Sequence, residues 1–245
     1  MNSVDIHFHL LPGVDDGPPD MCESVALART AVADGTRIVV VTPHVRSDFV
    51  TEPLALRALV HELRCRLAAE GVPLELRTGG ELGHDMVGRL DQAELEAIAQ
   101  GPPDGLWLLV ETPFEGFTAD FHAATTELRG RGFGVVLAHP ERGYAPQEGL
   151  RRELDTGSVA QVNALSLTGG HGPNAERTGR ALVAEGLVSV VASDAHGDTR
   201  PPALGLARAA LLAHGADRQT AYELTLDAPR RLLARGMRRR SSLAA

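Results

Sequence analysis

The strongest constraint on the fold is the alternation of seven short apolar segments with longer segments of helical pattern. The apolar segments are rich in β-branched residues, and runs such as 38–41 are continuously apolar, as in strands buried on both faces. Strands that alternate with helices form βαβ units and a parallel sheet. We expect strands at 4–9, 37–44, 74–81, 107–111, 134–139, 159–163 and 188–194. Helices are expected at 21–33, 53–70, 118–131, 147–154, 175–184 and 202–212.

The number of predicted strands and the even composition favour one closed α/β barrel over an open sheet. We expect a single domain over residues 1–236, which includes two final helices at about 218–226 and 228–234. The remaining segment, 237–245, contains Arg238, Arg239 and Arg240, and we expect it to be a disordered tail.

Histidines and isolated acidic residues gather at the predicted strand ends. Parallel strands of an α/β barrel direct their carboxyl ends to one mouth, where the active site lies. One further acid, Asp16, falls in the loop after the first strand. The residues that we expect at this mouth are His7, His9, Asp16, His44, Glu81, Glu111, His139, Asp194 and His196.

The spacing of these residues predicts a metal site. Side chains at positions i and i+2 of a strand point the same way, so His7 and His9 offer two imidazoles to one ion. Asp194 and His196 repeat this spacing. Imidazole and carboxylate without thiolate suit manganese, iron, zinc or cobalt. Bridging acids allow a site of two or three ions, which can activate water and clamp both oxygens of a displacement at phosphorus.

The composition excludes several mechanisms. All 24 basic residues are arginine, so Schiff-base chemistry, a P-loop lysine and a carbamylated lysine bridge between metals are impossible. Any phosphate clamp must therefore be arginine, and Arg142 and Arg200 follow His139 and His196 closely enough to reach the mouth. Arg46 is a third candidate.

Other classes of function are also disfavoured. A net charge of −8 argues against nucleic acid as a partner. A cysteine phosphatase needs arginine six positions after its nucleophile, but Cys22 and Cys65 are followed there by Ala28 and Gly71. Since no apolar run reaches the length that spans a bilayer, we expect a cytoplasmic protein without membrane insertion.

Several motifs together resemble the PHP (polymerase and histidinol phosphatase) superfamily. Within it, the chain is similar to the bacterial capsule-biosynthesis tyrosine phosphatases of the CpsB/CapC/YwqE type. The resemblance covers about residues 4–235. It rests on the segment 5–17, on Thr42-Pro43-His44, Gly79-Gly80-Glu81 and Glu111, on His139-Pro140-Glu141-Arg142, on 192–196, on Arg200-Pro201-Pro202 and on 227–230.

The resemblance implies a distorted seven-stranded PHP barrel with three divalent ions, expected to be manganese, iron or zinc. It places one ion on His7, His9, Glu81 and Asp194, a second on Glu81, Glu111 and His139, and a third on Asp16, His44 and His196. It further implies direct attack of a metal-bridging hydroxide on phosphorus. The implied substrate is a phosphotyrosine protein, a bacterial tyrosine kinase that controls polysaccharide export.

Alternatives remain open at this stage. The same fold serves other phosphate esters, such as histidinol phosphate or a sugar or nucleotide phosphate. Segments at the predicted rim, 82–85, 143–144 and 169–172, depart from the pattern of the tyrosine phosphatases. A binding protein with structural metals, or an amidohydrolase that bridges its metals with glutamate, would also fit parts of the pattern.

Overall fold

Two parallel sheets form the framework of the protein. The computed structural model describes residues 3–143 and 147–237. One sheet has the order β1-β2-β4 and the other the order β3-β5-β6-β7-β8-β9, and neighbouring strands pair in parallel throughout. The strands are β1 (Ser3–Phe8), β2 (Thr36–Val41), β3 (His44–Val45), β4 (Glu75–Thr78), β5 (Glu81–Leu82), β6 (Trp107–Glu111), β7 (Gly134–Ala138), β8 (Val159–Asn163) and β9 (Val188–Ala192).

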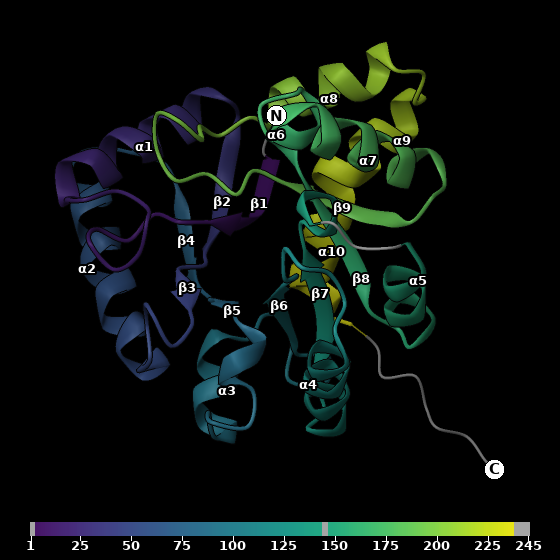
Figure 1. Ribbon diagram of the computed structural model, residues 1–245. Coiled ribbons are helices and arrows are strands. Elements are labelled where there is room, and N and C mark those ends of the chain that lie inside the picture. The colour runs from purple at the N-terminus through teal and green to yellow at the C-terminus, as the bar shows by residue number, and fades with distance from the viewer. Residues whose placement is uncertain (1–2, 144–146, 238–245) are drawn as a thin grey trace.

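Helices surround these sheets (Figure 1). They are α1 (Met21–Ala33), α2 (Leu56–Ala69), α3 (Gln92–Ile98), α4 (Ala119–Gly130), α5 (Gln147–Asp155), α6 (Ala164–Leu167), α7 (Gly172–Ala184), α8 (Leu204–Ala213), α9 (Arg218–Tyr222) and α10 (Ala228–Arg235). The helices α1 and α2 pack on β2 and β4, whereas α4 and α5 pack on β7 and β8. Among the described residues, no helix is both long enough and apolar enough to cross a membrane.

The described residues alone do not show the expected seven strands as one closed barrel. The predicted second strand is divided at Thr42-Pro43 into β2 and β3, and the predicted third at Gly79-Gly80 into β4 and β5. Proline lacks the N–H that a ladder uses, and the two glycines pack closely, since a Cβ on Gly79 would lie 2.6 Å from Val40 Cγ1. The described residues therefore form two sheets, and the α/β class with parallel strands is confirmed.

The two sheets adjoin at β1 and the chain after β9. Phe8 and Ala195 form an isolated parallel bridge. The N–H of His9 donates to the carbonyl of Ala195 at 2.9 Å, and the N–H of Asp194 donates to the carbonyl of His7 at 2.9 Å. These bonds fix the carboxyl ends of β1 and β9 side by side.

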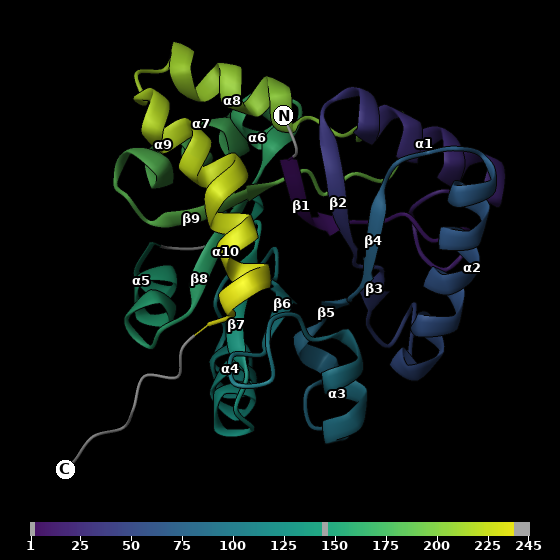
Figure 2. The ribbon, with the colours of Figure 1, turned by 180° about the vertical axis from the view of Figure 1, so that it is seen from behind.

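The core has two parts. The larger lies between the strands and the surrounding helices, and the smaller joins inward strand residues such as Val4 and Val190 to α10. Figure 2 shows α10 lying across the strands on the face opposite to that of Figure 1. Trp107 is fully buried there, and its Nε1 donates to the carbonyl of Leu232 at 3.0 Å. The N–H of Met237 donates to the carbonyl of Gly105, and the expected tail beyond it, 238–245, lies outside the described residues.

Candidate metal centre

The carboxyl ends of the strands bring all nine predicted residues into one cluster. His7 lies in β1, Glu111 ends β6, and His139 directly follows β7. His44 and Glu81 begin the short strands β3 and β5, which pair with each other at these two residues. Asp194 and His196 follow β9, while Asp16 reaches in from the loop after β1. Most of the nine are buried, and Asp16 is the most exposed, with 47% of its side chain accessible.

Two of these residues have a left-handed backbone. The φ angle is 37° at His139 and 53° at Asp194. Residues other than glycine seldom adopt this region, and such positions gather at functional sites, where the surrounding structure holds them. His139 directly follows β7 and Asp194 is the second residue after β9, so the chain turns there at the mouth.

Glu81 lies at the centre of the cluster and is completely buried. Its Oε2 lies 3.0 Å from His44 Nδ1, 3.2 Å from His7 Nε2 and 3.3 Å from His9 Nε2. Despite these distances, neither Glu81 Oε2 nor His44 Nδ1 makes a hydrogen bond of acceptable geometry. Buried polar atoms normally have a hydrogen-bond partner. Lone pairs that converge without bonding one another are the arrangement expected around a cation, so the residues fit a metal site.

The donor atoms fall into three overlapping groups, each compact enough for one ion. They are His7, His9, Glu81 and Asp194; His44, Glu81 and Glu111; and His9, Asp16, His44 and His196. The first equals one of the sets implied by the resemblance. The second contains His44 in place of His139, and the third adds His9.

The difference from the implied sets has a geometric reason. His44 uses both ring nitrogens, because Nδ1 faces Glu81 and Nε2 lies 3.4 Å from Asp16 Oδ1. His139 instead lies on the other oxygen of Glu81, with Nε2 at 2.8 Å from Oε1. Glu81 thus presents one oxygen to His7, His9 and His44 and the other to His139, as a bridging carboxylate would.

Charge and burial oppose each other within the cluster. Burial alone would lower the pKa of His7, but the carboxylates of Glu81 and Asp194 outweigh it and raise this pKa to about 9. Likewise, burial is outweighed by Glu81 and Asp16 at His44, whose pKa is raised to about 11. Burial and the neighbouring His9 lower the pKa of His196 to about 4. Without ions the cluster therefore keeps protons on some imidazoles that a metal would displace.

A second layer of polar residues orients the histidines. The Nδ1 of His7 lies 2.9 Å from Gln161 Oε1, and the Nδ1 of His9 lies 2.7 Å from Asp15 Oδ2. Partners of this kind leave the other ring nitrogen free for an ion. Gln161 Nε2 donates to Asn163 Oδ1 at 2.8 Å, and Asn163 Nδ2 donates to Asp194 Oδ2 at 2.6 Å. These partners were not predicted from the sequence, although Gln161 and Asn163 at positions i and i+2 of a buried strand were a usable signal.

Three arginines border the cluster, and each pairs with one of its carboxylates. Arg142 Nη1 donates to Asp194 Oδ2 at 3.1 Å, and Arg200 Nη2 donates to Asp16 Oδ2 at 2.7 Å. Arg46 Nη1 lies 2.9 Å and 3.2 Å from the two oxygens of Glu111. All three side chains remain partly exposed. The structure thus places both predicted arginines and the third candidate at the mouth.

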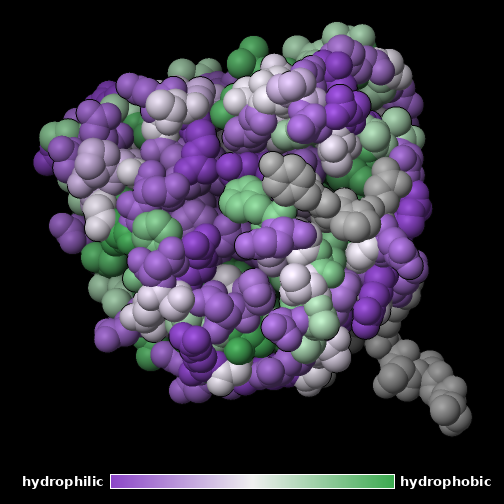
Figure 3. All heavy atoms as spheres, in the orientation of Figure 1, coloured by the Kyte–Doolittle hydropathy of each residue, from purple (hydrophilic) through white to green (hydrophobic). Residues whose placement is uncertain are grey.

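Two exposed phenyl rings flank the same mouth. The ring of Phe49 is stacked on His44 with centroids 5.3 Å apart, and that of Phe114 on His139 at 6.4 Å. The guanidinium of Arg142 also lies over the ring of Phe114, 5.3 Å from its centroid. Phe49 and Phe114 are 38% and 45% exposed, on a protein whose surface in Figure 3 is mainly hydrophilic. Exposed aromatic side chains beside a cluster of cations and carboxylates mark a ligand-binding rim.

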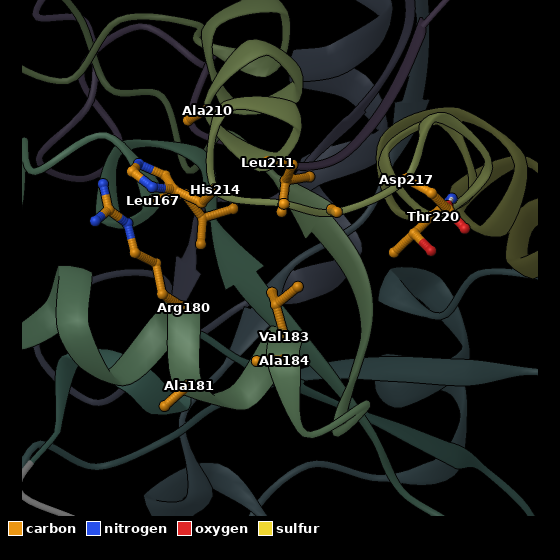
Figure 4. A pocket seen from close by; sticks show the side chains of 12 residues that line it. Leu167, Arg180, Ala181, Val183, Ala184, Ala210, Leu211, His214, Asp217 and Thr220 are labelled. Carbon is orange, nitrogen blue, oxygen red and sulfur yellow. Dashed lines mark hydrogen bonds between the residues drawn. The ribbon is translucent and has the colours of Figure 1, made fainter.

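A separate cavity lies away from the cluster. It has a volume of about 760 Å³ and lies between α7 and the segment from α8 to α9 (Figure 4). Its walls are mostly small apolar side chains, with Arg180 and His214 at one end. None of the nine clustered residues lines it.

Comparisons with known proteins agree with the motifs. A family model described as capsular polysaccharide synthesis, CpsB/CapC, matches residues 3–234. The tyrosine-protein phosphatase YwqE of Bacillus subtilis is 32% identical over 197 residues, which cover 79% of this chain and 77% of YwqE. The tyrosine-protein phosphatase CpsB of Streptococcus pneumoniae is 28% identical over 243 residues, 94% of this chain and 98% of CpsB.

Solved structures give the same result at the level of the fold. A structure from crystallographic work on YwqE of Bacillus subtilis and CpsB of Streptococcus pneumoniae, described as metal-dependent tyrosine phosphatases, matches with a TM-score of 0.82. It is 31% identical, and the match covers 94% of this chain and 93% of that one. An organophosphorus hydrolase from Deinococcus radiodurans matches with a TM-score of 0.57 at 17% identity, which is a likeness of fold alone.

Proposed function

This chain belongs to the CpsB/CapC family of capsular polysaccharide synthesis, and from that premise we propose that it is a metal-dependent protein-tyrosine phosphatase. The observation that carries the proposal is the cluster itself. Imidazoles and carboxylates converge on Glu81 at the strand ends, and three arginines surround them. The cluster therefore offers ligands for metal ions, and the arginines beside it offer hydrogen-bond donors suited to a phosphoryl group.

The nine clustered residues would hold two or three divalent ions. Nitrogen and oxygen donors without thiolate suit manganese, iron or zinc. Ions bound there would activate a water molecule and neutralise charge on the phosphoryl group. Glu81 is the proposed bridge, because its two oxygens face different sets of histidines. Gln161 and Asp15 keep His7 and His9 in the orientation that binding requires.

The arginines would bind the phosphoryl oxygens. Arg142 uses one of its guanidinium nitrogens on Asp194, which leaves other donors to face the mouth. Arg200 is arranged in the same way on Asp16. Their paired carboxylates fix both guanidinium groups in place, so little side-chain entropy is lost when a phosphate binds.

The exposed phenyl rings favour an aryl phosphate over histidinol phosphate and sugar phosphates. A tyrosyl ring that approaches the cluster can stack against Phe49 or Phe114, whereas a sugar has no aromatic ring and histidinol has only the smaller imidazole. The phenolate that leaves is a weak base, so the reaction needs less help from a general acid than an alkyl ester does.

The fold contributes one further point to the proposal. We infer that the two sheets correspond to a distorted seven-stranded PHP barrel in which β2 continues as β3 and β4 as β5. The N–H of Gly79 donates to the carbonyl of Val41, and that of Glu81 to the carbonyl of Pro43, which supports continuity across both breaks. A crystal structure with bound metal would test this description directly.

The proposed activity is tested with metal-loaded protein. We expect hydrolysis of p-nitrophenyl phosphate and of phosphotyrosine peptides, and much slower hydrolysis of histidinol phosphate, glucose 6-phosphate and nucleoside monophosphates. His7→Ala and Asp194→Ala should lose both bound metal, measured by elemental analysis, and activity. A folded, metal-replete protein without turnover on aryl phosphates would contradict the proposal, and a preference for histidinol phosphate would favour the alternative.

The physiological substrate and location are the remaining parts of the proposal. A bacterial tyrosine kinase of polysaccharide export is the substrate we propose, and dephosphorylation of a purified kinase by this protein is the test. A cytoplasmic location and the absence of nucleic-acid binding stay predictions from the sequence.

A further inference from the structure

Two cavities border the cluster, and Phe114 is part of the lining of both. The first, of about 710 Å³, is also lined by Arg142, His171 and Arg177, and we call it the arginine cavity. The second, of about 460 Å³, is also lined by Asp85 and Glu115, and we call it the acidic cavity. Both cavities also contain charged side chains that are not part of the metal cluster.

The arginine cavity has an uncompensated positive charge. Arg177 is exposed on α7, and its Nη2 donates to Asn174 Oδ1 at 2.7 Å. Within residues 3–143 and 147–237, no carboxylate lies at ion-pair distance from Arg177. The one acid in the lining, Glu141, is buried and accepts hydrogen bonds from Ser166 Oγ and the N–H of Asn163.

His171 adds no charge to the arginine cavity. Its Nδ1 lies 3.0 Å from Ser166 Oγ, and that hydroxyl donates to Glu141 at 2.6 Å, so Nδ1 carries the proton of this bond. Burial, together with the guanidinium of Arg142, lowers the pKa of His171 to about 4. The exposed positive charge of the arginine cavity therefore lies on Arg177, since Arg142 already pairs with Asp194.

The acidic cavity has the opposite charge. Arg46 is its one arginine, and its guanidinium is already shared between Asp48 and Glu111. Two acids remain, Asp85 and Glu115. Asp85 Oδ2 accepts from the N–H of Ser47 at 3.1 Å, which does not neutralise it.

Both cavities adjoin the place where a phosphoryl group would bind. Arg142 connects the arginine cavity to Asp194, and Arg46 connects the acidic cavity to Glu111. A ligand held at the cluster with its ring against Phe114 would extend into one cavity on each side. Opposite charges at the two sides give such a ligand a preferred direction.

We propose that the two cavities bind the residues that flank phosphotyrosine in the substrate protein, acidic residues in the arginine cavity and basic residues in the acidic cavity. This inference rests on the proposed function, because it assigns the sequence context of the same substrate. Arg177 and Glu115 are the specificity-determining residues of the two sides. Since the chain as a whole has a net charge of −8, the arginine cavity is a local exception that an acidic segment would seek.

The test compares two phosphopeptides of equal composition, Glu-Glu-pTyr-Arg-Arg and Arg-Arg-pTyr-Glu-Glu, each extended by the same neutral residues. Metal-loaded wild-type protein should hydrolyse one order with a kcat/KM about three- to fivefold above the other, the ratio expected for exposed charge pairs worth up to about 1 kcal/mol. The ratio should shrink at high ionic strength. Arg177→Glu and Glu115→Arg should each move it toward or past unity, and Arg177→Gln should give an intermediate ratio.

Arg235→Glu is the matched control, because Arg235 is exposed on α10, which packs on the opposite face. It makes the same change of charge and should leave the peptide ratio and the hydrolysis of p-nitrophenyl phosphate unchanged. Equal kcat/KM values for the two peptides, or a ratio that Arg177→Glu does not change, would overturn this inference while p-nitrophenyl phosphate is still hydrolysed. Loss of all aryl phosphate hydrolysis in the wild type would instead overturn the proposed function.

Discussion

Replacement of Gln161 by leucine is a sharp test of the metal centre, because it changes no proposed ligand. Gln161 is completely buried, and its Oε1 lies 2.9 Å from His7 Nδ1. With an ion on His7 Nε2, the ring proton must sit on Nδ1, and in Gln161→Leu it would point at a methyl group. A buried donor left without a partner costs about 1–3 kcal/mol.

The ion-free protein can avoid part of this cost. There His7, whose pKa is raised to about 9, can release the proton on Nδ1 and keep the one on Nε2, which lies 3.2 Å from both Glu81 Oε2 and Asp194 Oδ1. The penalty therefore falls on the metal-bound state, and we expect metal affinity to drop about 10- to 100-fold. Calorimetric titration with Mn²⁺ or Zn²⁺ at pH 8, beside a chelator competition, measures the change.

Gln100→Leu provides the control for this experiment. Gln100 is 7% exposed, and its Nε2 donates to the carbonyls of Thr78 and Ala99 rather than to a proposed ligand. It should lower the free energy of unfolding but leave metal affinity unchanged. If folded Gln161→Leu bound metal as tightly as the wild type, His7 would not be a ligand oriented by Gln161, and the assignment of the first group would be wrong.

Three further predictions concern proton release on metal binding, the buried carboxylate of Glu153 and the exposed ring of Phe114. Because the pKa of His7 is about 9 and that of His44 about 11, metal binding should release protons, and metal affinity should rise as the pH increases from 6 to 9. Calorimetric titrations in buffers of different ionisation enthalpy count the released protons. A metal affinity that does not change with pH would contradict this prediction. The pKa of Glu153 lies below its ordinary 4.5, since burial is outweighed by His122 and Arg129, so its contribution to stability is complete above 4.5 and is lost as the pH falls through the lower folded value. Glu153→Gln should therefore lower the free energy of unfolding in urea at pH 7 by about 1–3 kcal/mol. On acidification the variant should lose less of its remaining stability than the wild type loses. Equal losses of stability would refute the role of Glu153 as a stabilising carboxylate. Phe114→Ala should raise KM for phosphotyrosine about two- to tenfold but not for a small alkyl phosphate, and an equal change for both would exclude ring stacking.

The location of the candidate site was accessible from the sequence because it depends on strand direction alone. Buried parallel strands all end at one mouth, so any histidine or acid at such an end is brought to the others whatever the packing between them. His139 and Asp194 show the principle, since they lie one and two residues after the ends of β7 and β9 and both reach the cluster. The type of residue and its position at the end of a strand were enough to predict where the site lies.

The interruptions of the strands were harder to predict. Pro43 follows the apolar run 38–41, and the pair Gly79-Gly80 follows a segment that alternates apolar and polar residues. Hydrophobic periodicity registers neither the missing N–H of proline nor the close packing of glycine. The helix α3 was not predicted because its seven residues are too few to show a clear helical period. Its capping box, in which Asp91 and Glu94 bond each other's backbone N–H, was nevertheless present in the sequence.

Contacts between distant side chains could not be read from spacing. His44 faces both Glu81 of β5 and Asp16 of a loop, which depends on the rotation of one imidazole ring. The ligand sets implied by the resemblance instead placed His139 beside Glu111. The pairing of Arg46 with Glu111 joins residues 65 positions apart. Such contacts are set by the path of the chain between elements, which no periodicity encodes.

The absence of lysine and the position of Glu81 together decide how ions could be bridged in this fold. A chain without lysine side chains cannot bridge two ions through a carbamylated lysine, so the side chains left to bridge them are carboxylates. Of the clustered acids, Glu81 occurs in two of the three donor groups and also contacts His139 through its second oxygen. Asp194 is held by Asn163 and Arg142 on Oδ2, which leaves Oδ1 alone to face His7. Composition thus leaves acids as the side chains that could bridge two ions, and hydrogen bonding leaves Glu81 as the acid that can offer both of its oxygens.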